Sequence, residues 1–243
     1  MKKAAAKTRP RPAAKPAAAP PAPVAAPPAP ASAPKPRAVD PRLLQAGGVL
    51  LGVLALFVLA NSTFFLKRIG HRLNPPVVAE PQADAPDPYL LAVAGTPDRI
   101  RIPSLGIDAP LVEAATRTQA AYKAALQKGV THFPGTAPAG GVGNAYFFGH
   151  SSDLPWAKGD YKTVFALLPT IEVGAKIYVT DHDGNAYAYA AEATRVVVPS
   201  DLSVLADPGN GKRTLTLQTS YPVGTALRRF IVTAGFEGEV LVK

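Results

Sequence analysis

The chain of 243 residues, with a mass of 25.2 kDa, can hold one ordinary domain with extensions or two small domains. It contains no cysteine, which excludes disulfide scaffolds, zinc ribbons, iron–sulfur sites and a cysteine nucleophile. The formal net charge of +9 is uneven: nine Lys/Arg against one Asp give +8 in residues 1–42, whereas 14 Lys/Arg against 16 Asp/Glu give −2 in residues 73–243. A nucleic-acid-binding domain needs its positive charge on the folded surface, so we predict no nucleic-acid partner.

Residues 1–42 form a low-complexity basic segment in which 27 positions are Ala or Pro. The segment has no aromatic residue and no apolar period, so it cannot bury enough surface to offset the entropy of ordering. We predict a disordered basic arm.

Residues 43–66 are 24 consecutive residues without a charged side chain. As a helix they would extend about 36 Å, enough to cross a hydrocarbon core of about 30 Å. The run begins far from the N-terminus and is followed by Lys67 and Arg68, unlike a cleaved signal peptide. We therefore predict a retained transmembrane helix. Nine Lys/Arg precede it and three follow in residues 67–72, which predicts a cytoplasmic N-terminus and an extracytoplasmic C-terminal domain.

Residues 67–97 contain six prolines with Ala and acidic residues between them, which is typical of a semi-extended stalk. Residues 98–243 then alternate between apolar and polar positions over many short stretches, which favours an antiparallel-rich barrel or sandwich. The predicted elements are strands over 99–102, 107–112, 145–149, 176–180, 186–198, 214–219 and 229–234, a helix over 119–128, and a short helix or turn over 163–168.

Three histidines lie in this domain. His182 lies in the hairpin turn predicted at Asp183-Gly184, and His132 follows the predicted helix, so both are interpreted as structural or solvent-exposed. No ligand pattern for a metal is found around them, and we predict neither metal nor cofactor. His150 differs because it ends an apolar strand, where a scaffold presents reactive groups to a cleft.

The stretch Gly149-His150-Ser151 resembles the nucleophile elbow of α/β hydrolases only superficially. The fifth position of that motif requires Gly, and this chain has Asp153. Pro155 also follows too soon for the helix that the elbow must open, so this interpretation is rejected.

A second set of residues, TLQTS at 216–220 followed by Arg229 nine residues later, resembles the sortase family of transpeptidases. Sortases carry T-L-x-T-C at the end of one strand, an Arg opening the next strand and a His ending an earlier one. His150, within GNAYFFGHSS, falls where the family His falls. The sequences IPSLGI at 102–107 and FPGT at 133–136 add to the resemblance, which covers nearly all of residues 98–238. The short loop around Pro222 and Gly224 resembles classes D and E more than class A.

The resemblance implies a closed, antiparallel-rich β-barrel of about eight strands with short helices, preceded by the transmembrane helix. It also implies that residue 220 attacks a peptide carbonyl, that His150 moves the proton, and that Arg229 stabilises the oxyanion. Arg228 is the adjacent alternative to Arg229, and because neighbouring residues alternate faces along a strand, only one of the two should face the cleft. The loop 198–207 is expected to contact the peptide, and the substrate-binding residues implied are Leu202, Val204, Thr219 and Pro222.

The sequence departs from the family at the nucleophile, where Ser220 replaces the family Cys. A hydroxyl ionises much less readily than a thiol and needs a general base held by a third group. Three interpretations remain: a Cys-to-Ser change that traps substrate or silences the enzyme, a natural variant of low or no activity that binds sorting signals, and a working Ser enzyme.

The implied partners are LPxTG-like sorting-signal peptides of surface proteins, an amine acceptor (a cell-wall precursor or a pilin Lys) and membrane lipid. Two further classes of function stay open. One is a non-catalytic, membrane-tethered peptide-binding module built on the same barrel. The other is a structural envelope protein that binds no peptide.

Overall fold

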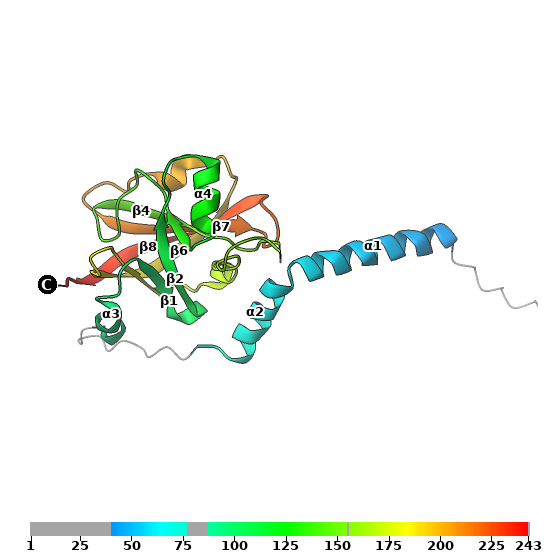
Figure 1. Cartoon of the computed structure of the whole chain (residues 1–243), viewed down its shortest axis with the longest axis horizontal. Helices are drawn as coiled ribbons and strands as arrows, with labels where there is room; N and C mark the ends of the chain where they lie inside the picture. The colour runs from blue at the N-terminus through cyan, green and yellow to red at the C-terminus, as the bar shows by residue number, and fades with distance from the viewer. Residues whose placement is uncertain (1–39, 77–86, 155, 243) are drawn as a thin grey trace, which may run out of the picture. The chain divides into compact units, whose positions relative to one another are not determined.

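The computed structural model of the chain describes residues 40–76, 87–154 and 156–242 (Figure 1). Except for its last three residues, the predicted basic arm 1–42 lies outside them. The helices are α1 Pro41–Ala60, α2 Ser62–Leu73, α3 Pro88–Val93 and α4 Gln119–Leu126, with 3-10 turns η1 Pro103–Leu105, η2 Leu168–Thr170 and η3 Leu202–Leu205. The strands are β1 Arg99–Ile102, β2 Ile107–Glu113, β3 Val130–His132, β4 Gly143–Phe148, β5 Lys176–Thr180, β6 Ala186–Val197, β7 Arg213–Tyr221 and β8 Arg228–Val240.

The apolar segment forms helix α1, whose most apolar window has a mean hydropathy of 2.4. Within the described residues it is the one helix long and apolar enough to cross a membrane. The helix predicted over 43–66 is divided, because α1 ends at Ala60 and α2 begins at Ser62. At the junction the Asn61 side-chain amide donates to the Phe57 carbonyl oxygen at 2.9 Å, competing with the backbone ladder.

The segment 67–97, predicted as a stalk, contains helical structure at both described ends. Helix α2 continues to Leu73, and α3 begins at Pro88. The Asp87 carboxylate caps α3 by accepting from the backbone N–H groups of Tyr89 and Leu90, and it also accepts from the Tyr178 hydroxyl at 2.6 Å. Leu90 and Val93 are buried, so α3 packs against the folded domain.

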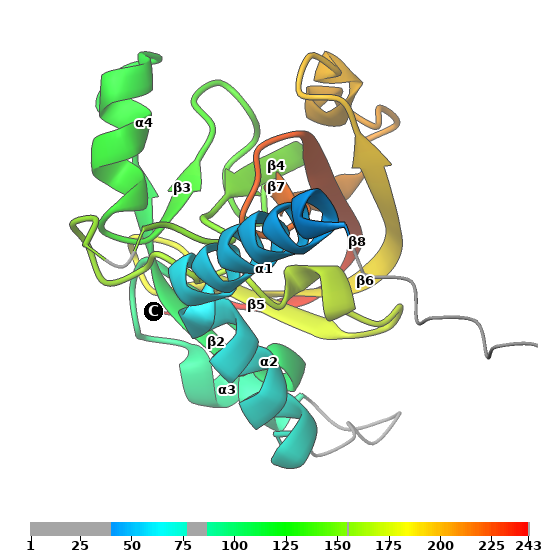
Figure 2. The same ribbon diagram turned by 90° about the vertical axis from the view of Figure 1, so that its right-hand side faces the viewer.

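The eight strands close into a barrel in the order β1-β2-β3-β4-β7-β8-β6-β5. The pairs β2/β3 and β4/β7 are parallel and the other pairs are antiparallel, so the predicted antiparallel-rich barrel is confirmed as a mixed one. Strand β3 was not predicted, because Val130–His132 is only three residues long and follows α4 closely. Figure 2 shows β4, β7, β8 and β6 side by side, with the orange loop before β7 rising above them.

Strand β7 places alternate residues on opposite faces of the sheet. Leu215 and Leu217 are fully buried in the main core, together with Phe147 of β4 and Val232 of β8. The residues between them face the other way, which we call the outer face. There Tyr146, Val204 and Ile231 form a separate buried cluster, packed by the side chains of Phe133, Phe148, Val197 and Leu205.

We expect Leu217→Ala to lower the free energy of unfolding by about 2–5 kcal/mol, because it leaves a cavity in a closed core. Leu202→Ala is the matched control, since Leu202 is 71% exposed, and we expect it to change stability by less than about 0.5 kcal/mol. Urea unfolding measures both. Equal losses for the two variants would contradict the assignment of Leu217 to the core.

Candidate active site

The register of the sheet brings His150, Ser220 and Arg229 to one level of the outer face. Phe148 pairs with Gln218 in the parallel β4/β7 ladder, and the Gly149 N–H continues it by donating to the Gln218 carbonyl at 3.1 Å. Two residues beyond that pair are His150 and Ser220. Ser220 is the direct antiparallel partner of Arg229. His150, Ser220 and Arg229 are far apart in sequence, but they occupy adjacent positions on the neighbouring strands β4, β7 and β8, with His150 just beyond the end of β4.

The turn that presents His150 depends on a glycine. A Cβ atom on Gly149 would lie 2.7 Å from a ring carbon of Phe165, closer than any real contact. Phe165 is fully buried, and its backbone N–H donates to the His150 carbonyl at 2.9 Å. The core residue Phe165 thus fixes the backbone on both sides of the Gly149–His150 bond.

Thr219, predicted to bind substrate, lies on the core face of β7. Its side chain is 2% exposed, and its hydroxyl donates to the Gly149 carbonyl at 2.9 Å. Its neighbour Ser220 lies on the opposite, outer face, because residues alternate along the strand. Thr219 joins β7 to the end of β4 and so positions the backbones that carry His150 and Ser220.

His150 is half-buried, and burial lowers the pKa of its imidazole below the usual 6.5. The Asp153 carboxylate partly opposes this by favouring the charged ring. Asp153 does not hydrogen-bond to the ring; it accepts from the Leu154 backbone N–H at 2.8 Å. Within the described residues no carboxylate forms an ion pair or hydrogen bond with His150. His150 is thus a neutral base at neutral pH, without the third group of a serine-protease triad.

An NMR titration of the His150 ring should give a pKa below 6.5, because burial disfavours the imidazolium. The reaction should therefore need a deprotonated His150, and the acid side of the rate profile should lie below 6.5 in pH. Asp153→Asn should lower the pKa further, because it removes the charge that opposes burial. A midpoint above 6.5, or a rise in Asp153→Asn, would contradict this environment.

The two adjacent arginines lie on opposite faces at the start of β8. Arg228 pairs with Tyr221, whereas Arg229 pairs with Ser220. The Nη1 atom of Arg229 donates to two backbone carbonyl oxygens, those of Ala226 and Arg228, at 3.1 Å each. These bonds hold the guanidinium at the end of the loop 222–227, and its other nitrogens have no hydrogen bond within the described part of the chain.

The other predicted binding residues lie directly after β7 and in the loop between β6 and β7. Pro222 is exposed directly after the strand that carries Ser220. Leu202 and Val204 lie on η3, where Leu202 is 71% exposed and Val204 is buried against Tyr146 and Ile231. Val204 is thus part of the wall beside the outer face, while Leu202 faces solvent.

Sequence reasoning missed a polar pair on the outer face. The Tyr146 hydroxyl donates to Gln218 Oε1 at 2.5 Å, and Gln218 is two residues before Ser220 on the same face. Burial raises the pKa of Tyr146, and the positive charges of Arg229 and Arg195 oppose that shift. The sequence spacing could have placed Tyr146 on this face, because Tyr146 precedes His150 by four residues and residues an even number apart share a strand face.

The histidines interpreted as structural have local partners. His132 is buried at the end of β3, with Nδ1 2.7 Å from a Glu113 carboxylate oxygen and Nε2 3.0 Å from both the Ala137 carbonyl and the Thr136 hydroxyl. His182 is exposed in its hairpin, where hydrogen bonding to Asp98 raises its pKa. No group of three or more metal-ligating side chains is found among the described residues.

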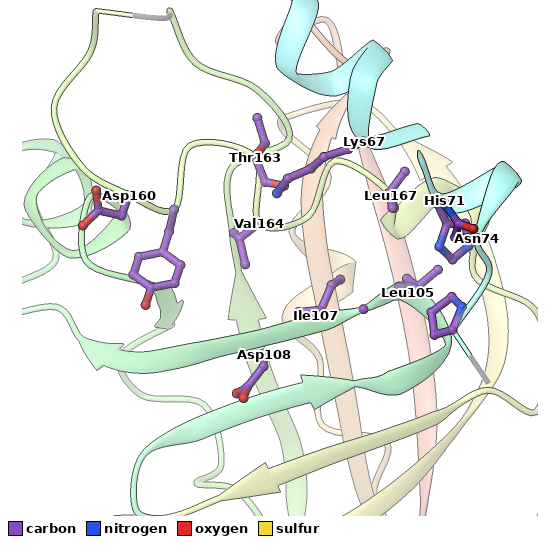
Figure 3. A pocket seen from close by; sticks show the side chains of 13 residues that line it. Lys67, His71, Asn74, Leu105, Ile107, Asp108, Asp160, Thr163, Val164 and Leu167 are labelled. Carbon is purple, nitrogen blue, oxygen red and sulfur yellow. The ribbon is translucent and has the colours of Figure 1, made fainter. Parts of the chain in front are cut away.

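The pocket of about 390 Å³ in Figure 3 is a separate feature. Lys67, Thr163 and Leu105 are among its lining residues, and the Lys67 ammonium donates to the Thr163 carbonyl at 3.2 Å. His150, Ser220 and Arg229 do not line it. A second pocket, of about 630 Å³, lies on the outer face beneath the loop between β6 and β7, and these three residues do not line it either.

The sequence model of the sortase domain matches residues 100–237, which is more than half of the chain and almost the whole barrel. The chain belongs to the sortase family. The matched range contains His150, Ser220 and Arg229 and nearly all of the barrel, with β1 beginning one residue before it and β8 ending three residues after it. The sortase fold inferred from the ordered sequence motifs is thus confirmed, and the family is one of transpeptidases.

Solved sortase structures are similar to this chain. Sortase C1 from Streptococcus suis has 21% identity and a TM-score of 0.50, covering 72% of this chain and 96% of that one, and it supports the fold alone. A Clostridium perfringens sortase D5 transpeptidase has 26% identity and a TM-score of 0.47, covering 58% and 78%. Sortase E from Streptomyces avermitilis has 26% identity and a TM-score of 0.47, covering 60% and 91%. No match was found among curated proteins.

Proposed function

We propose that this sortase is a membrane-anchored transpeptidase that cleaves an LPxTG-type sorting signal and transfers the acyl part to an amine acceptor. The observation that carries the proposal is the common level of His150, Ser220 and Arg229 on the outer face, given by the pairing of β4, β7 and β8. The acceptor is a cell-wall precursor or a pilin Lys amine.

The residue at 220 attacks the carbonyl carbon of the scissile peptide bond. His150 takes the hydroxyl proton, and a bond forms between the residue-220 oxygen and that carbon. The carbon–nitrogen bond then breaks as His150 returns the proton to the leaving amine. In the second half, the acceptor amine attacks the ester and gives a proton to His150, which passes it to the departing residue-220 oxygen. Arg229 donates hydrogen bonds to the oxyanion in both halves.

Helix α1 serves as the anchor in this proposal. Its length and hydropathy support a membrane span, and the excess of Lys/Arg before it supports a cytoplasmic N-terminus with the barrel outside. The short loop 222–227 between β7 and β8 supports a place near the class D and E branches.

The test is incubation of the Ser220→Cys variant with LPxTG-type peptides and an amine acceptor, followed by mass spectrometry of the products. We expect a cleaved peptide joined to the acceptor. Ser220→Cys combined with His150→Ala is the control and should form no product. If the Cys form cleaves no member of a sorting-peptide library, the proposed reaction is wrong.

A second function is favoured by one observation, the lack of a carboxylate partner on His150 within the described residues. Without that third group, Ser220 is poorly activated, and the native chain would bind sorting peptides without turning them over. Calorimetry tests this alternative. It predicts peptide binding that is unchanged by Ser220→Ala and by His150→Ala, with no turnover even in the Ser220→Cys form.

A further inference from the structure

Helix α2 begins where a membrane span formed by α1 would end. The 20 residues of α1 extend about 30 Å as a helix, which matches a hydrocarbon core of about 30 Å. Asn61, with φ −108° and ψ 18°, interrupts the helical backbone before α2 begins at Ser62. In a chain anchored by α1, the start of α2 therefore lies at the boundary between acyl chains and headgroups, and α2 need not follow the direction of α1.

An apolar stripe runs along α2 and is left open. Leu66, Ile69 and Leu73 are 70%, 55% and 74% exposed, and α2 contributes no buried residue. Their spacing of three and four residues places the three side chains within about 60° of one another around the helix. A row of large, exposed apolar side chains on one helix face indicates a surface that another apolar phase covers.

The charged residues of α2 suit an anionic surface. The helix carries Lys67, Arg68 and Arg72 and no Asp or Glu. Arg68 and Arg72 are four residues apart, so they form a second row beside the apolar stripe. Neither arginine forms an ion pair or a hydrogen bond with another residue that the structure describes. A helix with one apolar face and a basic polar face is typical of a helix that lies in a membrane interface.

A third side of α2 faces the barrel and leaves the apolar stripe free. Lys67, His71 and Asn74 line the pocket of about 390 Å³, and Figure 3 shows Lys67 reaching toward Thr163. These three lining residues are about 80–140° around the helix from Leu66. The helix can therefore contact the barrel on one side and an apolar phase on another at the same time.

We propose that α2 lies in the interface of the extracytoplasmic leaflet of the bilayer that α1 spans. Leu66, Ile69 and Leu73 enter the acyl region, and Arg68 and Arg72 bind the phosphate groups of anionic phospholipids. The inference rests on α1 as the anchor, which is part of the proposed function, and adds a second, lipid-selective membrane contact. Because α2 also contacts the barrel through Lys67, it holds the barrel at the bilayer surface.

The experiment uses the full-length chain in lipid nanodiscs. Because the chain has no cysteine, Leu66→Cys, Ile69→Cys and Leu73→Cys each accept a single fluorescent label. Quenching by lipids with nitroxides at known depths should place these labels about 5–10 Å inside the headgroup boundary in discs of phosphatidylglycerol. Two controls should be quenched little: Asn74→Cys, next to Leu73 on the side that faces the barrel, and Val142→Cys, an exposed apolar residue before β4.

Lipid charge provides a second test. In discs of phosphatidylcholine, or in about 0.5 M salt, quenching at Ile69→Cys should fall, because the attraction of the arginines to anionic headgroups is absent or screened. Arg68→Gln/Arg72→Gln should lower the ratio of membrane-bound to free α2 in phosphatidylglycerol by about 10-fold or more. Lys123→Gln/Lys128→Gln removes the same charge from α4 and should leave that ratio unchanged.

A label at Leu54→Cys separates the anchor from the inference, since Leu54 lies inside the proposed span. Deep quenching at Leu54→Cys with none at Ile69→Cys or Leu73→Cys would overturn the inference and leave the anchor intact. A label at Ile69→Cys that is shielded from water but not reached by lipid quenchers would show that a protein covers the stripe, which also overturns it. Absence of quenching at Leu54→Cys would reject both the anchor and the inference.

Discussion

Ser220→Cys is expected to raise kcat/KM for a sorting peptide by about 100-fold or more over the native chain. A thiol with an ordinary pKa near 8.5 supplies some thiolate at neutral pH, and a neighbouring cation such as Arg229 increases that fraction. The Ser220 hydroxyl has to rely on His150, which no carboxylate orients within the described residues. The measurement is steady-state cleavage of a fluorogenic sorting peptide by both forms.

The matched control is Ser151→Cys. Ser151 is a buried neighbour of His150 on the same loop, and it lies on neither β7 nor β8. A thiol there should give no gain. If Ser151→Cys accelerates cleavage as much as Ser220→Cys, the position of the nucleophile is wrong. A native chain as fast as its Cys form would instead show a working Ser enzyme in which another group activates Ser220.

Arg229→Ala in the Ser220→Cys form should lower kcat by about 100- to 1,000-fold, because it removes the donor opposite the attacking residue. The Arg229 guanidinium donates to the Ala226 and Arg228 carbonyls, and the Arg229 backbone pairs directly with Ser220. Arg229→Lys should recover only part of the loss, since an ammonium cannot reproduce the planar set of donors.

Arg228→Ala is the control for Arg229, because it removes the same charge one residue away and on the opposite face. We expect less than about a threefold change in kcat for that variant. Circular dichroism would verify that both proteins fold. A larger loss in Arg228→Ala than in Arg229→Ala would reverse the assignment of the two arginines.

The fold was largely predictable because most strands carry their own local pattern. TLTLQT alternates apolar and polar residues and forms the centre of β7, and Ala186–Val197 formed the long strand expected after the Asp183-Gly184 turn. Strand β8 extends to Val240, beyond the predicted 229–234, because Gly235 and Gly238 interrupt the apolar pattern while the pairing with β6 continues past them, with a register shift between Phe236 and Gly238. Helix α3 was missed because Pro88 looked like part of a stalk, whereas proline suits the first turn of a helix.

The site was predictable only in part. His150, Ser220 and Arg229 came from an ordered resemblance to a family, and their common level depends on a parallel β4/β7 ladder that no local pattern reveals. The burial of Thr219 and its hydrogen bond to the Gly149 carbonyl also depend on the β4/β7 register. Tyr146, Gln218 and the pocket under η3 arise from side chains of different strands meeting on one face, so they needed the register.

The central claim is that residue 220 carries the acyl intermediate on the outer face beside His150 and Arg229. The most direct test is intact-protein mass spectrometry, with peptide mapping, of the Ser220→Cys form incubated with a sorting peptide and no amine acceptor. We expect a covalent adduct equal in mass to the acyl part of the peptide, located on residue 220 and absent from Ser220→Ala. An adduct on another residue, or a bound peptide that never becomes covalent, would contradict it.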